Sequence, residues 1–151
     1  MSNKYRKQRR AKRHIPFEPK VPMMVKAALV FGPLDAIIDR LEADGTALTD
    51  ERGNPVAIDL NGEEYDAAGG IEGLIWHLEI HASRHGLTLP LDPLRELQIA
   101  FKYIKPIMPS TVAKLREALP VLRRAMADAN QEEQIDILRT VQIRAELEHA
   151  A

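Results

Sequence analysis

The chain has 151 residues with a hydrophobic content of 45%, which suits one domain of ordinary size. It contains no cysteine, which excludes disulfides and thiolate metal sites and agrees with a reducing compartment. No apolar run approaches the roughly 20 residues that a membrane-spanning helix needs, and the charged start does not resemble a secretory signal peptide. We therefore expect a soluble cytoplasmic protein with no membrane partner.

The net charge of −1 hides a strong asymmetry along the chain. Residues 1–20 carry eight Lys or Arg side chains and one acid, Glu18, for a charge of +7. The rest of the chain holds the remaining 13 basic and 21 acidic side chains, for a charge of −8. A basic segment attached to an acidic body favours binding to a polyanion or docking on an acidic surface.

Residues 1–14 are predicted to form a basic, disordered arm, because like charges repel and the segment has almost nothing to bury. If the arm becomes helical when it binds a partner, its four arginines share one face, and each guanidinium can donate two hydrogen bonds to a phosphate. The predicted nucleic-acid contacts are Lys4, Arg6, Lys7, Arg9, Arg10, Lys12 and Arg13. Docking on an acidic protein surface and a purely solvating or localising role are the alternatives.

The segment from Asn3 to His14, NKYRKQRRAKRH, resembles the arginine-rich RNA-binding peptides of lambdoid phage antitermination N proteins. Those peptides also carry an Arg-Arg core near the start of the chain. The similarity is one of composition, which histone tails, ribosomal protein tails and capsid arms share. It implies RNA or DNA as the partner of the arm.

Beyond the arm, prolines at positions 16, 19 and 22 predict an extended polyproline II strap over residues 15–22. Residues 23–151 are then expected to form a single helical domain. The predicted class is mainly α, with five to six helices packed around a central helix at residues 71–85. A small β-hairpin or meander is expected at about residues 46–66, where Val56, Ile58 and Leu60 alternate ahead of Asn61-Gly62.

The central helix is predicted from apolar residues at the spacing of a buried face. Those residues are Ile71, Leu74, Ile75, Leu78 and Ala82. Trp76 and Ile80 point roughly the opposite way, so the helix should be covered on two sides. We expect a loop at Gly69-Gly70 and a left-handed cap at Gly86.

The other helices are predicted from their caps and prolines. Pro33 should open a helix that ends at Gly45, and Asp92-Pro93 should open one that carries Ile104 inward. Ser110 should cap a helix in which Pro120 forces a kink or a break, and Asn130 should cap the last one. On that last helix Ile137, Leu138, Val141 and Ala145 line one face. Ile143 and Leu147 form a second apolar face, a candidate protein contact.

Three histidines, His77, His81 and His85, recur every four residues on the central helix. Two imidazoles at i and i+4 can share one metal, so His77 and His81 are a candidate pair. His77 and His85 are about 12 Å apart along the axis, too far for one ion. Glu79 points away from the histidine face, so the metalloprotease base is missing. The simpler expectation is that these histidines are helix-flank or partly buried groups without a metal.

No catalytic motif is present in the sequence. The three serines lie outside any nucleophile-elbow pattern, and there is neither a Walker loop nor GxGxxG. We therefore expect no enzymatic activity and no cofactor.

The arginine-rich start, the helical body and the closing RTVQIRAELEHA are similar in style to short proteins encoded by phages and prophages of Gram-negative bacteria. That resemblance implies a phage-related role in the host cytoplasm. Two hypotheses follow from the sequence. One is a nucleic-acid-binding accessory or regulatory protein whose acidic body docks onto a protein machine. The other is an interaction or assembly protein whose arm docks on an acidic partner or, in an oligomer, on a neighbouring subunit.

Overall fold

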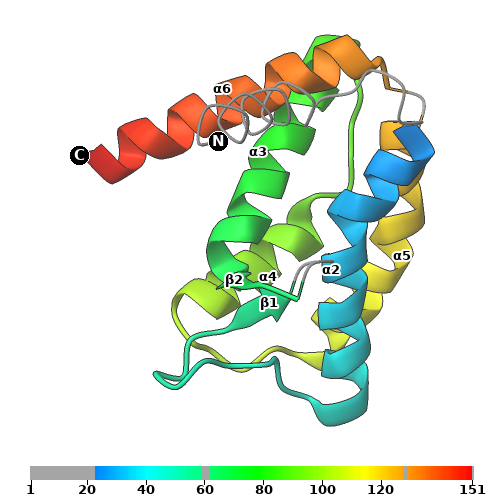
Figure 1. The fold of residues 1–151 in the computed structure, drawn as a ribbon. Coiled ribbons are helices and arrows are strands. Elements are labelled where there is room, and N and C mark those ends of the chain that lie inside the picture. Colours follow the sequence, from blue (N-terminus) through cyan, green and yellow to red (C-terminus); the bar gives the residue numbers. More distant parts are fainter. Residues whose placement is uncertain (1–22, 59–61, 128, 151) are drawn as a thin grey trace, which may run out of the picture.

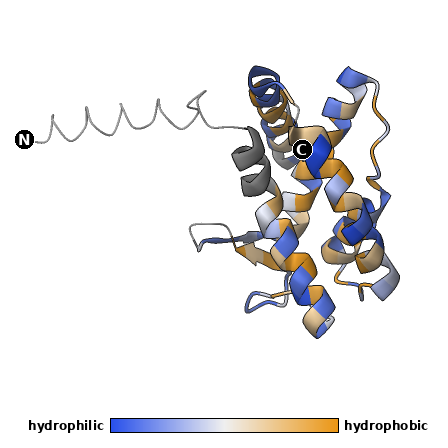
Figure 2. Ribbon diagram, turned by 90° about the vertical axis from the view of Figure 1, so that its right-hand side faces the viewer, coloured by the Kyte–Doolittle hydropathy of each residue, from blue (hydrophilic) through white to orange (hydrophobic). Residues whose placement is uncertain are grey.

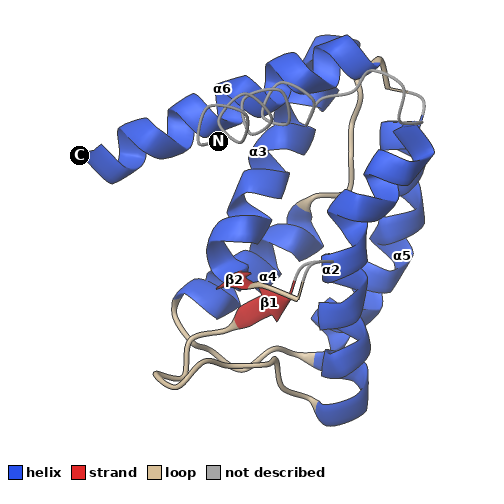
Figure 3. Ribbon diagram, viewed as in Figure 1, coloured by secondary structure: helices blue, strands red, loops and turns tan. Residues whose placement is uncertain are grey.

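The computed structural model describes residues 23–58, 62–127 and 129–150, so the arm and the strap lie outside the described residues. Its class is mainly α with one small antiparallel hairpin, as predicted (Figure 3). The elements in chain order are α2 (Met23–Asp44), β1 (Val56–Ile58), β2 (Glu64–Asp66), α3 (Ala67–His85), α4 (Asp92–Lys102), α5 (Pro109–Ala127) and α6 (Gln131–Ala150).

The helices pack in a connected series (Figure 1). Helix α2 lies against α5, α5 contacts α4, and α4 packs on α3, which in turn carries α6. Along the helices apolar and polar segments alternate, as in amphipathic helices that bury one face (Figure 2). The largest side chains that are fully buried include Ile38, Leu78, Leu97, Leu115 and Leu122, so one core runs through α2 to α5.

Helix α2 runs through Pro33 rather than starting there, which corrects the predicted boundary. The expected stripe is nonetheless buried, with Leu34 and Ile38 among its members. Gly45 ends the helix at φ 72°, and its N–H donates to the Leu41 carbonyl at 2.9 Å. On the outer side Arg116 of α5 pairs with Asp39 and Glu42, which raises the pKa of the guanidinium.

Helix α3 begins at Ala67, so Gly69 and Gly70 belong to its first turn and not to a loop. The Asp66 carboxylate accepts from the Gly69 N–H at 3.1 Å and caps the helix. A Cβ at Gly70 would lie 2.7 Å from Cε2 of Tyr65, so the glycine lets the hairpin approach closely. Gly86 ends the helix in the left-handed region at φ 62°, as predicted.

The hairpin pairs Ala57 of β1 with Tyr65 of β2, within the predicted range of residues 46–66. An isolated bridge between Thr49 and Pro55 extends the pairing on one side. Residues 59–61, which include Asn61 of the predicted turn, lie outside the described residues. Strand β2 ends at Asp66, which is also the N-cap of α3, so the hairpin leads directly into that helix.

Helix α5 is a single helix through Pro120, so of the predicted kink or break the break does not occur. Because that proline is exposed, the carbonyl it leaves unpaired can be hydrated. Two further predictions need correction. Ile104, predicted to face inward, lies beyond the end of α4 and is 62% exposed. On α6, Ile137 is fully buried as expected, but Leu138 is 41% exposed.

Candidate functional site

A group of polar side chains from two helices meets between α3 and the start of α6. Helix α6 begins here because Asn130 Oδ1 accepts from the Glu133 N–H at 3.1 Å, the predicted cap. Acids in its first turn add to this, since the macrodipole favours negative charge there. Buried Ile137, one turn further on, anchors the helix. The first two turns of α6 thus face the histidine side of α3.

Gln134 of α6 joins two of the predicted histidines. Its Oε1 lies 2.5 Å from His77 Nε2, and its Nε2 lies 3.0 Å from His81 Nδ1. All three side chains are buried, at 6%, 3% and 4% exposure for His77, His81 and Gln134. In this arrangement His77 Nε2–H donates to the amide oxygen, and the amide N–H donates to His81. The candidate metal pair His77 and His81 is therefore bridged by an amide, not placed to share an ion.

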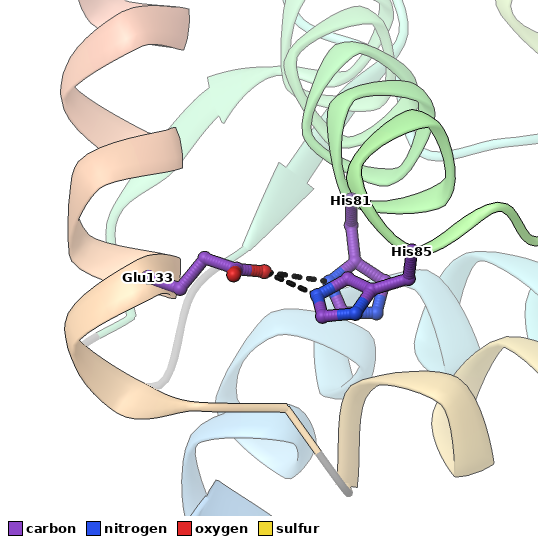
Figure 4. Close-up of side chains that lie close together, drawn as sticks. All are labelled: His81, His85 and Glu133. Carbon is purple, nitrogen blue, oxygen red and sulfur yellow. Dashed lines mark hydrogen bonds and ion pairs between the residues drawn. The ribbon is translucent and has the colours of Figure 1, made fainter.

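The third histidine joins His81 instead, with a carboxylate that the sequence analysis did not single out (Figure 4). Glu133 Oε1 accepts from His85 Nε2 at 2.5 Å and lies 3.8 Å from His81 Nδ1. The two rings stack with centroids 4.6 Å apart and a tilt of 40°. One ligand atom from each of the three residues lies within 4.8 Å of the other two.

Burial sets the protonation of the two inner histidines. Desolvation lowers the pKa of His77, which the bond to Gln134 opposes and the charge of His81 reinforces. Desolvation also lowers the pKa of His81, reinforced by His85, whereas Glu133 and the Ala125 backbone raise it. Both rings are therefore neutral at pH 7, and neutral imidazole is the form that can offer a lone pair to a ligand. His77 Nδ1 is buried with no hydrogen-bond partner among the described residues.

The predicted contact face on α6 is exposed. Ile143 and Leu147 are 57% and 67% exposed, and the C-terminal part of α6 projects beyond α3 (Figure 1). Between them Arg144 turns back to α3, with Cζ 4.2 Å from the centroid of the Trp76 ring. This contact covers the second side of α3 and leaves the two aliphatic side chains available to another molecule.

A second exposed apolar group lies at the end of α4 and was not predicted. Tyr103, Ile104 and Met108 are each more than 60% exposed. The ammonium groups of Lys102 and Lys105 both lie 5.7 Å from the centroid of the Tyr103 ring. Ile104 has a φ of 52°, an unfavourable value for a β-branched residue. The exposure of Ile104 was not predictable from the sequence, because Ile104 continues the apolar spacing of α4.

The predicted arm contacts, Lys4 to Arg13, lie outside the described residues. No protein-family profile matches the chain, and no match is found among curated proteins or among solved structures. Across the described ranges, no helix is both long enough and apolar enough to cross a bilayer.

Proposed function

We propose that the protein is a non-enzymatic nucleic-acid-binding accessory or regulatory protein, in which the basic arm contacts phosphates and the helical body docks onto a protein. The observation that carries this proposal is the separation of charge, +7 in residues 1–20 against −8 in the rest. A basic segment gains affinity for nucleic acid by releasing condensed counterions from phosphates. An acidic body adds nothing to that gain, so the arm would supply the binding.

Ion pairs within the body also support assigning phosphate binding to the arm and protein docking to the body. Four of its arginines lie against carboxylates of neighbouring elements or turns: Arg84 with Asp136, Arg95 with Asp92, Arg116 with Asp39 and Glu42, and Arg123 with Asp35. A phosphate would have to compete with these carboxylates. The body is thus better suited to a protein partner, and Ile143 and Leu147 on α6 are the proposed contacts.

An assembly protein is the second candidate. The exposed aliphatic face of α6 favours it, because such a face is suited to a second helix from a neighbouring subunit or another protein. In that case the arm would dock on an acidic protein surface, and nucleic acid would have no part in the function.

Fluorescence anisotropy with labelled single-stranded RNA and duplex DNA tests the proposal. The arm variant replaces Arg6, Arg9, Arg10 and Arg13 with Gln. The matched control removes the same charge from exposed positions of the body by replacing Lys105, Lys114, Arg124 and Arg139 with Gln. We expect the arm variant to lose binding and the control to retain it, with both variants folded by circular dichroism.

Light scattering on the same samples separates the two candidates. A nucleic-acid-binding arm predicts that the arm variant keeps the oligomeric state of the unaltered chain. An assembly arm predicts that the variant changes its oligomeric state while neither form binds nucleic acid with useful affinity. Equal loss of affinity in the arm variant and the control would contradict a specific role for the arm.

A further inference from the structure

The group formed by His81, His85 and Glu133 has the chemistry of a metal site. Imidazole and carboxylate are ligands that Zn²⁺ and neighbouring divalent transition metals accept. His81 and His85 are four residues apart on α3, and Glu133 comes from a different helix. Among the residues that the structure describes, these three bring ligand atoms within 4.8 Å of one another.

The distances are close to those of a bound ion. Tetrahedral ligands about 2.0–2.1 Å from an ion lie roughly 3.3–3.4 Å from each other. His81 Nδ1 and Glu133 Oε1 are 3.8 Å apart, slightly wider than this. His85 Nε2 and Glu133 Oε1 are 2.5 Å apart, a hydrogen bond that must open by about 1 Å. Small side-chain rotations are enough, because His85 is 41% and Glu133 26% exposed.

The surroundings of His81 are those of an oriented ligand. A metal-binding histidine usually donates its other ring N–H to a carbonyl or carboxylate, which fixes the tautomer. The backbone of Ala125 raises the pKa of His81, which is the effect of a backbone acceptor close to the ring. Its Nδ1 faces Glu133 and at present accepts from the Gln134 amide. An ion would displace that amide N–H, while Gln134 Oε1 remains bonded to His77.

We propose that His81, His85 and Glu133 bind one Zn²⁺ or similar divalent transition-metal ion, which fastens the start of α6 to the end of α3. Solvent completes the coordination, since three protein ligands leave at least one position open. The exposed His85 and Glu133 give the ion a path from solvent. Binding holds the docked position of α6, and with it the direction in which Ile143 and Leu147 project.

The test uses the full chain without an affinity tag, stripped of metal with a chelator and titrated with Co²⁺ as a spectroscopic probe. We expect one equivalent to bind with the visible absorption of low-coordinate Co²⁺, and Zn²⁺ to displace it. His85→Asn and Glu133→Gln are the ligand variants, chosen because both side chains reach solvent, and circular dichroism checks that each variant is folded. The matched controls are Glu132→Gln, the neighbouring exposed glutamate, and His149→Asn.

Each ligand variant should weaken Co²⁺ binding by at least about tenfold, the lower limit seen when even an outer partner of a metal ligand is lost. The controls should bind as the unaltered chain does. Zn²⁺ should also raise the melting temperature of the unaltered chain and the controls, but not of the ligand variants. The proposal is overturned if the unaltered chain binds no ion, or if His85→Asn and Glu133→Gln bind as tightly as the controls.

Discussion

Replacing Gln134 with leucine should destabilise the protein strongly, because the amide satisfies two buried histidine nitrogens at once. Its oxygen lies 2.5 Å from His77 Nε2 and its nitrogen 3.0 Å from His81 Nδ1. A buried polar group left without its partner costs about 1–3 kcal/mol. Two such groups, partly offset by the apolar burial of a leucine of similar size, give an expected loss of about 2–4 kcal/mol.

The assay is chemical denaturation at pH 7.5 with a chelator present, so that buried His77 and His81, whose pKa values are lowered, are neutral and no metal contributes. Gln142→Leu, the same change at an exposed position of α6, is the control and should stay within about 0.5 kcal/mol of the unaltered chain. The midpoint should shift without a change in the slope of the free energy against denaturant. A double-mutant cycle with His77→Phe should give a coupling of about 0.5–3 kcal/mol.

If Gln134→Leu and Gln142→Leu have the same small effect, the amide bridge does not hold α6 on α3. The same result would also mean that the bond from Gln134 does not hold the His81 ring in its orientation. A large loss with no coupling to His77 would instead assign the effect to packing at position 134 alone.

Three further predictions concern the core, the last helix and pH. Leu78→Ala should cost about 2–5 kcal/mol in denaturation experiments, because Leu78 is fully buried and a cavity would remain; a loss under about 0.5 kcal/mol would disprove its central position. Asn130→Ala should cost about 0.5–2 kcal/mol through loss of the α6 cap, whereas Asn130→Ser should keep most of the stability. Burial lowers the pKa of His77 below 6.5, so below that pH the unfolded chain binds more protons than the folded chain. Stability should therefore be complete above about pH 6.5 and fall towards pH 5, measured in chelator; an unchanged midpoint from pH 7.5 to 5 would contradict a neutral buried His77.

Local signals in the sequence predicted several helix ends, although Ser110 lies inside α5 and does not cap it. Asn130 and Gly86 act as caps because a side-chain acceptor and a left-handed glycine satisfy orphan backbone groups with only neighbouring residues involved. The buried stripe of α3 was equally predictable, since Ile71, Ile75 and Leu78 recur at the helical period.

The errors lie where tertiary contacts outweigh local preference. Gly69 and Gly70 are poor helix formers, yet both are helical in α3. The Asp66 carboxylate accepts from the Gly69 N–H, and Tyr65 packs where a side chain at position 70 would stand. Pro33 is disfavoured inside a helix, but helix α2 continues through it, and Leu34 next to it is buried in the core shared with α5. Helix propensities describe single residues and contain no information on either of these contacts.

The candidate site was predictable only in part. The four-residue spacing of the histidines shows that two can share a ligand, but it does not show which two. That choice depends on where α6 crosses α3, which brings Gln134 to His77 and Glu133 to His85. Glu132 and Glu133 both lie in the first turn of α6, and the face of the helix that packs on α3, with Gln134 and Ile137 buried, places Glu133 toward the rings.

The salt dependence of RNA affinity tests the central proposal most directly. If the arm neutralises about four phosphates, the logarithm of the affinity should fall against the logarithm of the salt concentration with a slope of roughly −3. A chain that lacks residues 1–14 should remain folded and show neither the affinity nor the slope. If the truncated chain binds RNA with the same affinity and the same slope as the full chain, the arm is not the nucleic-acid contact and the proposed function is wrong.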